Sequence, residues 1–275
     1  MTSSRRDSFR TIAGMFLGCS ASGVLRGQFA GSPRSDAEME KFLLGGTIVA
    51  QEEIGHGVTH PIKVTLRMGS TEHAAKIQVV DKELPPFFGA DNKAVPMHDS
   101  WRFNVAAYRL DRLLELRMAT VAVSRRFNGK PAGFSWWVDD VMFEEAERLK
   151  KGIEPPDPEN FGRQLDVARV FDELIINIDR NYSNLLITKS WHVALIDHSR
   201  SFNRSLGIRN KENLTRCSRL LMANMRALTV ANVTKACGTS LTKEEVNAVI
   251  ARRDRIVEFF ENAAREKGED KVYFS

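Results

Sequence analysis

The sequence predicts an α+β fold of two lobes, a strand-rich N-terminal lobe and a mainly helical C-terminal lobe. Residues 62–67 alternate between apolar and polar side chains, as a half-buried strand does, whereas beyond residue 140 apolar residues recur mainly at helical steps of three and four. A chain of 275 residues that is 43% hydrophobic can bury one large core or two smaller cores packed together. We therefore expect an N-lobe over residues 37–140 and a C-lobe over residues 141–275.

A short amphipathic helix over residues 37–44 is expected to open the N-lobe, because Gly45-Gly46 closes its pattern. Strand-like residues begin at 48–50, and the alternating run 62–67 continues the strand region. These segments predict the first part of an N-lobe sheet.

Residues 68–70 form the predicted turn into a further strand over residues 73–80. Successive residues of a strand point to opposite faces. Lys76 is therefore expected on the face opposite the apolar residues of this strand, which are Ala75, Ile77 and Val79.

A helix is predicted over residues 100–116, where apolar residues recur at steps of three and four. A β-hairpin follows, because strand-like residues 121–123 and 134–138 flank Asn128-Gly129, a dipeptide typical of a two-residue hairpin turn. Asp139-Asp140 closes the second strand, and the N-lobe is expected to end there.

The C-lobe is predicted to hold helices and one strand pair. The expected helices cover residues 143–151, 161–176, 214–228 and a last segment that begins at the capping box Thr242–Glu245 and runs towards Lys267. Residues 185–188 and 192–196 are strand-like, and residues 189–191 form the turn between them.

Three polar residues around this strand pair carry the functional interpretation. Asp179 precedes Asn184 by five positions, the separation of Asp and Asn in a kinase catalytic loop, and Asp197 follows thirteen positions later. Pairing of the strands would bring Asn184 and Asp197 to the open end of one hairpin, and their oxygens are ligands that Mg²⁺ prefers. Asp179 would orient an attacking hydroxyl. Taken singly, each of the three is also a common turn residue.

Gly55 and Gly57 lie between two predicted strands of the N-lobe. Glycine lacks the Cβ that would block a close approach, so such a loop can close over phosphate groups. Lys76 on the following strand stands where a kinase holds its phosphate-binding lysine. The alternative for Lys76 is a solubilising residue on an edge strand.

With both lobes considered, the sequence resembles the atypical branch of the protein-kinase-like superfamily. It looks like the phosphatidylinositol 3- and 4-kinase-like proteins and the secretory-pathway kinases that phosphorylate caseins. The resemblance extends over residues 48–205 and is carried by residues 106–114, residues 179–186, and residues 195–197 with Phe202 shortly after.

The resemblance implies a bilobal protein-kinase-like fold and an ATP-dependent phosphotransferase that uses Mg²⁺ or Mn²⁺ and acts on a hydroxyl of a protein or small molecule. It also implies the roles of the site residues: Asp179 would be the catalytic base, Gly55, Gly57 and Lys76 would bind the nucleotide, and Asn184 and Asp197 would bind the metal.

Two departures from the family pattern lead to alternative functions. Asn104 stands where these kinases have the Glu that anchors the lysine, and a neutral side chain cannot supply that ion pair. Asp197 is followed by His198-Ser199 instead of Phe-Gly. A catalytically inactive nucleotide-binding or partner-binding module is the first alternative, and transfer of AMP by the same fold is the second.

The first thirty residues resemble a bacterial export signal, because Arg5-Arg6 precedes a weakly apolar run over residues 11–25. Leu17–Cys19 also resembles a lipoprotein cleavage site. The run is too short and too rich in Gly and Ser to span a bilayer. Two localisations follow as alternatives, an exported protein and a cytoplasmic one.

The formal charge of +5 gives little reason to expect a nucleic-acid partner. Residues 1–30 contain four arginines and one aspartate and so contribute 4 − 1 = +3, and the remainder lacks clustered basic residues with interleaved aromatics. Cys217 and Cys237 are expected to be free buried thiols, with a disulfide between them as the alternative. The sequence contains no Cys/His grouping of the kind that binds zinc, so a zinc site is not expected.

Overall fold

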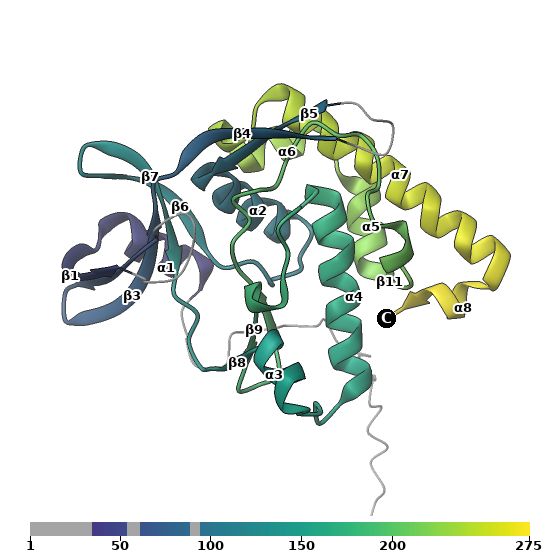
Figure 1. The fold of residues 1–275 in the computed structure, drawn as a ribbon, viewed down its shortest axis with the longest axis horizontal. Helices are drawn as coiled ribbons and strands as arrows, with labels where there is room; N and C mark the ends of the chain where they lie inside the picture. The colour runs from purple at the N-terminus through teal and green to yellow at the C-terminus, as the bar shows by residue number, and fades with distance from the viewer. Residues whose placement is uncertain (1–34, 54–60, 89–93) are drawn as a thin grey trace, which may run out of the picture.

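The computed structural model describes residues 35–53, 61–88 and 94–275 (Figure 1). The predicted export leader over residues 1–30 and the two glycines of the predicted phosphate loop, Gly55 and Gly57, lie outside the described residues. Among the described residues, no helix is both long and apolar enough to cross a lipid bilayer.

A five-stranded antiparallel sheet forms the N-terminal half of the fold, with the strand order β1-β2-β3-β7-β6. Its strands are β1 (Thr47–Glu53), β2 (Ile62–Met68), β3 (Thr71–Gln78), β6 (Ala122–Phe127) and β7 (Lys130–Trp136). The predicted hairpin at Asn128-Gly129 is confirmed: both residues have positive φ angles, 48° and 78°, as a type I′ turn requires. The strand predicted over residues 73–80 is β3, but it ends at Gln78, so Val79 lies beyond the strand and is 44% exposed.

Two helices complete this half of the fold, α1 (Asp36–Gly45) and α2 (Trp101–Leu113). Both were predicted from their apolar periodicity, and Ser35 and Ser100 cap their N-termini. Trp101, Val105 and Tyr108 of α2 belong to the hydrophobic cluster of the sheet. The opposite side of α2 belongs to the cluster of the helical half, to which it contributes Phe103, Ala106, Ala107 and Leu110, together with Leu114 at its C-cap. The lobe boundary near residue 140 stays a prediction.

A second hairpin, β4 (Asp81–Phe88) with β5 (Ala94–Ser100), was not predicted. In Figure 1 it runs along the top of the molecule. Proline is rare inside strands, so the sequence pattern with Pro85, Pro86 and Pro96 did not predict strands here. The structure accommodates the first two with a register shift between Leu84 and Phe87.

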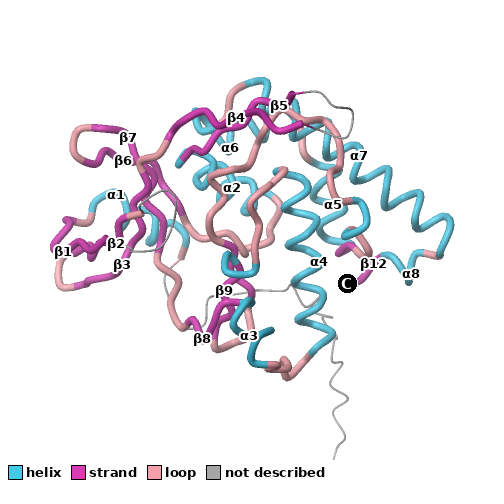
Figure 2. The backbone as a smooth tube through the Cα atoms, in the orientation of Figure 1, coloured by secondary structure: helices cyan, strands magenta, loops and turns pink. Residues whose placement is uncertain are grey.

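The second half is mainly helical, and Figure 2 shows its helices around a short strand group. In chain order its elements are β8 (Val141–Glu144), α3 (Glu145–Lys151), α4 (Pro158–Ile175), β9 (Leu185–Thr188), β10 (Val193–Leu195), β11 (Cys217–Ser218), α5 (Arg219–Ala227), α6 (Val230–Cys237), α7 (Lys243–Lys267), α8 (Glu269–Val272) and β12 (Tyr273–Phe274). The predicted capping box at Thr242 and Glu245 is present and begins α7.

Two helices in this half were predicted to begin too early. Residues 143–144 belong to β8, because they pair with β9 at Ile187 and Leu186, and the helix begins only at Glu145. The helix predicted from residue 214 begins at Arg219, because Cys217 and Ser218 pair with the C-terminal strand β12. In both places a tertiary strand pairing overrides the local helical pattern.

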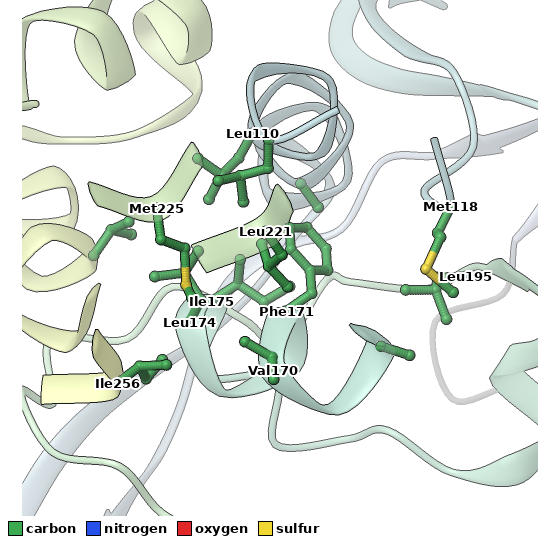
Figure 3. Packing of buried hydrophobic residues seen from close by; sticks show 14 of the residues in the cluster. Leu110, Met118, Val170, Phe171, Leu174, Ile175, Leu195, Leu221, Met225 and Ile256 are labelled. Carbon is green, nitrogen blue, oxygen red and sulfur yellow. The ribbon is translucent and has the colours of Figure 1, made fainter. Parts of the chain in front are cut away.

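The larger hydrophobic cluster lies where α2, α4, α5 and α7 meet (Figure 3). Leu110 of α2 packs towards Phe171 of α4 and Leu221 of α5, and Met118 lies beside Leu195 of β10. Cys217 and Cys237 are buried and free, as predicted. This core holds α4 and the β9–β10 pair, the two elements that present the candidate site.

Candidate active site

The segment that carries Asp179 leaves the C-terminus of α4 through a sharp turn. Ile176 has a φ of 48°, a left-handed conformation that is costly for a β-branched residue. Two backbone contacts hold the turn in place: the amide of Phe202 donates to the Ile175 carbonyl at 2.6 Å, and the amide of Ile178 donates to the Arg200 carbonyl at 3.4 Å. The turn exposes the Asp179 side chain, which is 49% accessible.

Arg180 fixes the loop that follows Asp179. Its guanidinium donates to both carboxylate oxygens of Asp172, at 2.9 and 3.0 Å. Its Nη1 also donates to the carbonyl oxygens of Asn184 and Ile196, at 3.0 and 2.7 Å. Arg180 therefore joins both strands of the β9–β10 pair, at their open end, to α4. The guanidinium suits this role because it holds several N–H donors in a fixed geometry.

The β9–β10 hairpin brings Asn184 and Asp197 to its open end, as the sequence predicted. Leu185 pairs with Leu195, and the Ile196 amide donates to the Asn184 carbonyl at 3.1 Å. Asp197 then adopts a φ of 54°, a left-handed conformation that aspartate tolerates better than most residues. This turn ends β10 and directs the chain away from the hairpin.

Lys76 of β3 faces this hairpin from the other half of the fold. Its Nζ lies 3.7 Å from Oδ2 of Asp197, and both side chains are partly shielded from solvent. Ala75 and Ile77, its neighbours along the strand, point the opposite way into the sheet core, as the alternation predicted. The structure therefore places the predicted phosphate-binding lysine beside the predicted metal-binding carboxylate.

The residues at this end of the hairpin fit a divalent cation. Oδ1 of Asp197 is buried and, among the described residues, has no hydrogen-bond partner, although carboxylate oxygens buried in proteins are normally paired. Within the same part of the chain no group of three or more His, Cys, Asp or Glu side chains could hold a metal by itself. A site with only Asp197 and Asn184 suits Mg²⁺ or Mn²⁺ that takes its other ligands from water and nucleotide phosphates.

Asn104, which stands in place of an expected glutamate, lies at the site, where its hydrogen bonds go to Gln78 and His198 and not to Lys76. Its Nδ2 donates to Oε1 of Gln78 at 2.8 Å, and its Oδ1 accepts the His198 backbone amide at 2.8 Å. Gln78 stands two residues after Lys76, on the same face of β3. A neutral amide relay thus connects β3, α2 and the segment after Asp197, so the anchoring of α2 to β3 is kept without an ion pair.

We expect Asn104→Leu to lower the free energy of unfolding by about 1–3 kcal/mol, because it leaves the Gln78 amide and the His198 amide buried without partners. Asn104→Asp is the matched control: it keeps the acceptor for His198, and the Gln78 amide can rotate to donate to it. Urea denaturation of the two variants and the wild type measures the difference. Equal stability of the Leu variant and the wild type would contradict the relay.

His198, the residue after Asp197, is buried, and its ring makes a T-shaped contact with the ring of Phe171. Burial, reinforced by the positive charges of Arg180 and Lys76, lowers the pKa of His198 well below its usual value. The imidazole is therefore neutral at physiological pH, and the ion pair of Asp197 is made by Lys76, at 3.7 Å.

Several residues of the site were not found from the sequence. Gln78 and Arg180 gave no sequence signal for the contacts they make. Arg200 and Asp99 form an ion pair at 3.0 Å across 101 positions of the chain. The segment after Asp197 is also bonded directly to the start of α2, since the Ser100 amide donates to the Ser199 carbonyl at 2.8 Å. Local periodicity cannot reveal such long-range pairs.

Solved structures show the same fold. Hydra Fam20, in a structure with sugar, has a TM-score of 0.67 and 15% identity over 87% of this chain and 93% of that chain. The Golgi casein kinase with Mn/ADP bound has a TM-score of 0.59 and 14% identity over 87% and 79% of the two chains. The Helicobacter pylori proinflammatory kinase CtkA has a TM-score of 0.52 and 9% identity over 82% and 98%.

No protein-family model matches the sequence, and no curated protein matches it. The structural likeness, at identities of 9–15%, establishes the fold. The chain has an atypical kinase-like fold of mixed α and β structure, as the sequence predicted, and it covers most of the length of hydra Fam20.

Proposed function

We propose that this protein is an ATP-dependent phosphotransferase that moves the γ-phosphoryl group of ATP to a hydroxyl of a protein or small molecule. The contact between Lys76 and Asp197 is the observation that carries this proposal. It joins a cation from the sheet to a carboxylate of the β9–β10 hairpin, on a fold that the Golgi casein kinase uses with Mn/ADP. Asp179 and Asn184 lie at the same end of that hairpin.

Each residue has a role that its position supports. Lys76 would bind phosphate oxygens, and Asn184 and Asp197 would hold the metal. A bound Mg²⁺ or Mn²⁺ would neutralise charge on the phosphate oxygens. Asp179, exposed at the edge of the site, would accept the proton of the attacking hydroxyl. Gly55 and Gly57 as phosphate-loop residues, and Lys76 as a nucleotide ligand, stay predictions.

The neutral Asn104 motivates the alternative of a nucleotide-binding module without catalysis. The relay from Gln78 through Asn104 to the His198 amide favours the enzyme, because it keeps α2 joined to both β3 and the Asp197 segment. Lys76 then needs no glutamate partner to stay in place, since Asp197 itself lies within ion-pair distance.

Incubation with ATP labelled separately at the α and γ phosphates tests the proposal. We expect the γ label, and not the α label, to appear on an acceptor from a library of serine- and threonine-containing peptides and small polyols, in the presence of Mg²⁺ or Mn²⁺. Transfer of the α label would show AMP transfer. Saturable nucleotide binding with neither label transferred would overturn the proposal in favour of the binding module.

The predicted export leader bears on where such an enzyme would work. ATP is abundant inside cells and has no obvious supply outside them, so an exported kinase would need a source of nucleotide. N-terminal sequencing of the protein from its native cell distinguishes the alternatives. If the protein is exported, we expect the isolated protein to have lost its leader by cleavage within residues 1–30. If it stays in the cytoplasm, we expect the leader to be intact.

A further inference from the structure

One arginine connects the predicted catalytic base to a buried carboxylate from the other half of the fold. Nε of Arg200 donates to Oδ2 of Asp99 at 3.0 Å, and Nη1 of Arg200 lies 3.1 Å from Oδ2 of Asp179. Asp99 is fully buried, whereas Asp179 is half exposed. The guanidinium therefore spans a fixed carboxylate and an accessible one.

Asp99 is held rigidly. It lies near the end of β5, where it pairs with Lys82 of β4, and the next residue, Ser100, caps α2 and bonds to the Ser199 carbonyl. Its second oxygen, Oδ1, finds no hydrogen-bond partner in the described part of the chain. A buried carboxylate needs a counter-charge, so Asp99 requires Arg200 and fixes its position in turn.

The backbone of Arg200 adds to this arrangement. Its carbonyl accepts the amide of Ile178, the residue directly before Asp179, at 3.4 Å. Side chain and backbone of Arg200 therefore both contact the segment that presents the predicted base. Arginine suits this position because two separate donors of one planar group can engage two carboxylates at once, which a lysine ammonium does with less defined geometry.

We infer that Arg200 is a positioning residue whose guanidinium ties Asp179 to the buried Asp99, and so fixes the predicted base in the orientation that phosphoryl transfer needs. This inference rests on the proposed function for its kinetic consequence. Its structural content, that Arg200 orders the segment around Asp179, does not depend on activity. Because Asp99 lies at the β5–α2 junction, this link also couples the orientation of the base to the start of α2.

The kinetic test compares Arg200→Met with Arg204→Met, which removes an exposed arginine from the same segment. We expect Arg200→Met to lower kcat about 10²-fold, since misplacement of a reacting group by about an ångström has an effect of that size, with the KM for ATP changed less than about 2-fold. Arg204→Met should leave both values near the wild type. A rise in the ATP KM with an unchanged kcat would assign Arg200 to nucleotide binding and overturn the inference.

A double-mutant cycle separates positioning from general structure. If Arg200 acts through Asp179, Arg200→Met should have little further effect on kcat in the Asp179→Asn background. An undiminished loss in that background would show that Arg200 acts by another route. Arg200→Met leaves Asp99 as a buried unpaired charge, so the variant pair Asp99→Asn with Arg200→Gln, which removes both charges, keeps the test valid if the single variant fails to fold.

Hydrogen exchange gives a readout that does not require activity. We expect the amides of residues 177–183 to exchange faster in the Arg200 variants than in the wild type, while those of β10 stay unchanged. Unchanged exchange in residues 177–183 would overturn the inference even in an active enzyme. The two proposals can also fail separately. If the wild type transfers no phosphate but residues 177–183 exchange faster in the Arg200 variants, the proposed function is refuted and the ordering of this segment by Arg200 is supported.

Discussion

Asp197→Ala is expected to abolish metal-dependent nucleotide binding and phosphoryl transfer together. Asp197 lies 3.7 Å from Lys76, and its buried Oδ1 has no hydrogen-bond partner among the described residues, as expected of the predicted metal ligand. Its loss removes the charged metal ligand and leaves Lys76 without its partner. We expect the increase in melting temperature produced by ATP with Mg²⁺ or Mn²⁺ to disappear, and transfer to fall by at least about 10³-fold.

Thermal denaturation with and without nucleotide and metal measures this effect. Asp254→Ala is the matched control, because it removes an exposed carboxylate from α7, where Asp254 pairs with Arg253 at the surface. The control should keep the full nucleotide-dependent shift. An Asp197→Ala protein that ATP stabilises as well as the wild type would remove the assignment of Asp197 as a metal ligand and the phosphotransferase proposal with it.

The parts of the site that the sequence predicted are those fixed by local pairing. Strands of alternating or continuous apolar residues around a short turn specify the register Leu185 to Leu195, and that register alone brings Asn184 and Asp197 to one end of the hairpin. Lys76 was predicted for a similar reason, since the two-residue period of β3 decides which face it occupies. In each case a short-range rule determines where the side chain lies.

The contacts that the sequence could not predict join residues far apart in the chain. Asn104 stands where the resemblance predicted a glutamate, but its hydrogen-bond partners, Gln78 and the His198 amide, lie 26 and 94 positions away and were not predicted. The pairing of Asp99 with Arg200 depends on how the β4–β5 hairpin lies against the segment after Asp197, and that hairpin was not predicted because of its prolines. No local period carries information about such packing.

Tertiary strand pairing that overrides a local helical pattern explains the errors in element boundaries. Phe143 fits a helical pattern, yet it pairs with Ile187 of β9, and this pairing extends the hairpin into a three-stranded sheet. Cys217 and Ser218 likewise leave the predicted helix to pair with the C-terminal strand. Both errors moved a helix start by a few residues and left the positions of Asp179, Asn184 and Asp197 unaffected.

Asp179→Asn is expected to lower the rate of transfer about 10²–10⁴-fold while leaving nucleotide binding intact. A general base contributes about 10²–10⁴-fold to such reactions, and an amide of the same shape cannot accept the proton of the hydroxyl. Asp179 is half exposed, so loss of its ion pair with Arg200 should change the free energy of unfolding by less than about 1 kcal/mol. Single-turnover transfer of the γ label and nucleotide titration of the same preparation measure the two properties.

The two variants together decide between an enzyme and a binding module. In an enzyme, Asp197→Ala loses binding and transfer, whereas Asp179→Asn slows transfer alone, because only Asp197 lies against Lys76 and the predicted metal position. In a binding module Asp179 has no proton to accept, and its replacement should alter neither nucleotide affinity nor any output that depends on it. Transfer that persists in Asp179→Asn at the wild-type rate would therefore show that another group takes the proton, and it would remove the functional basis for a positioning role of Arg200.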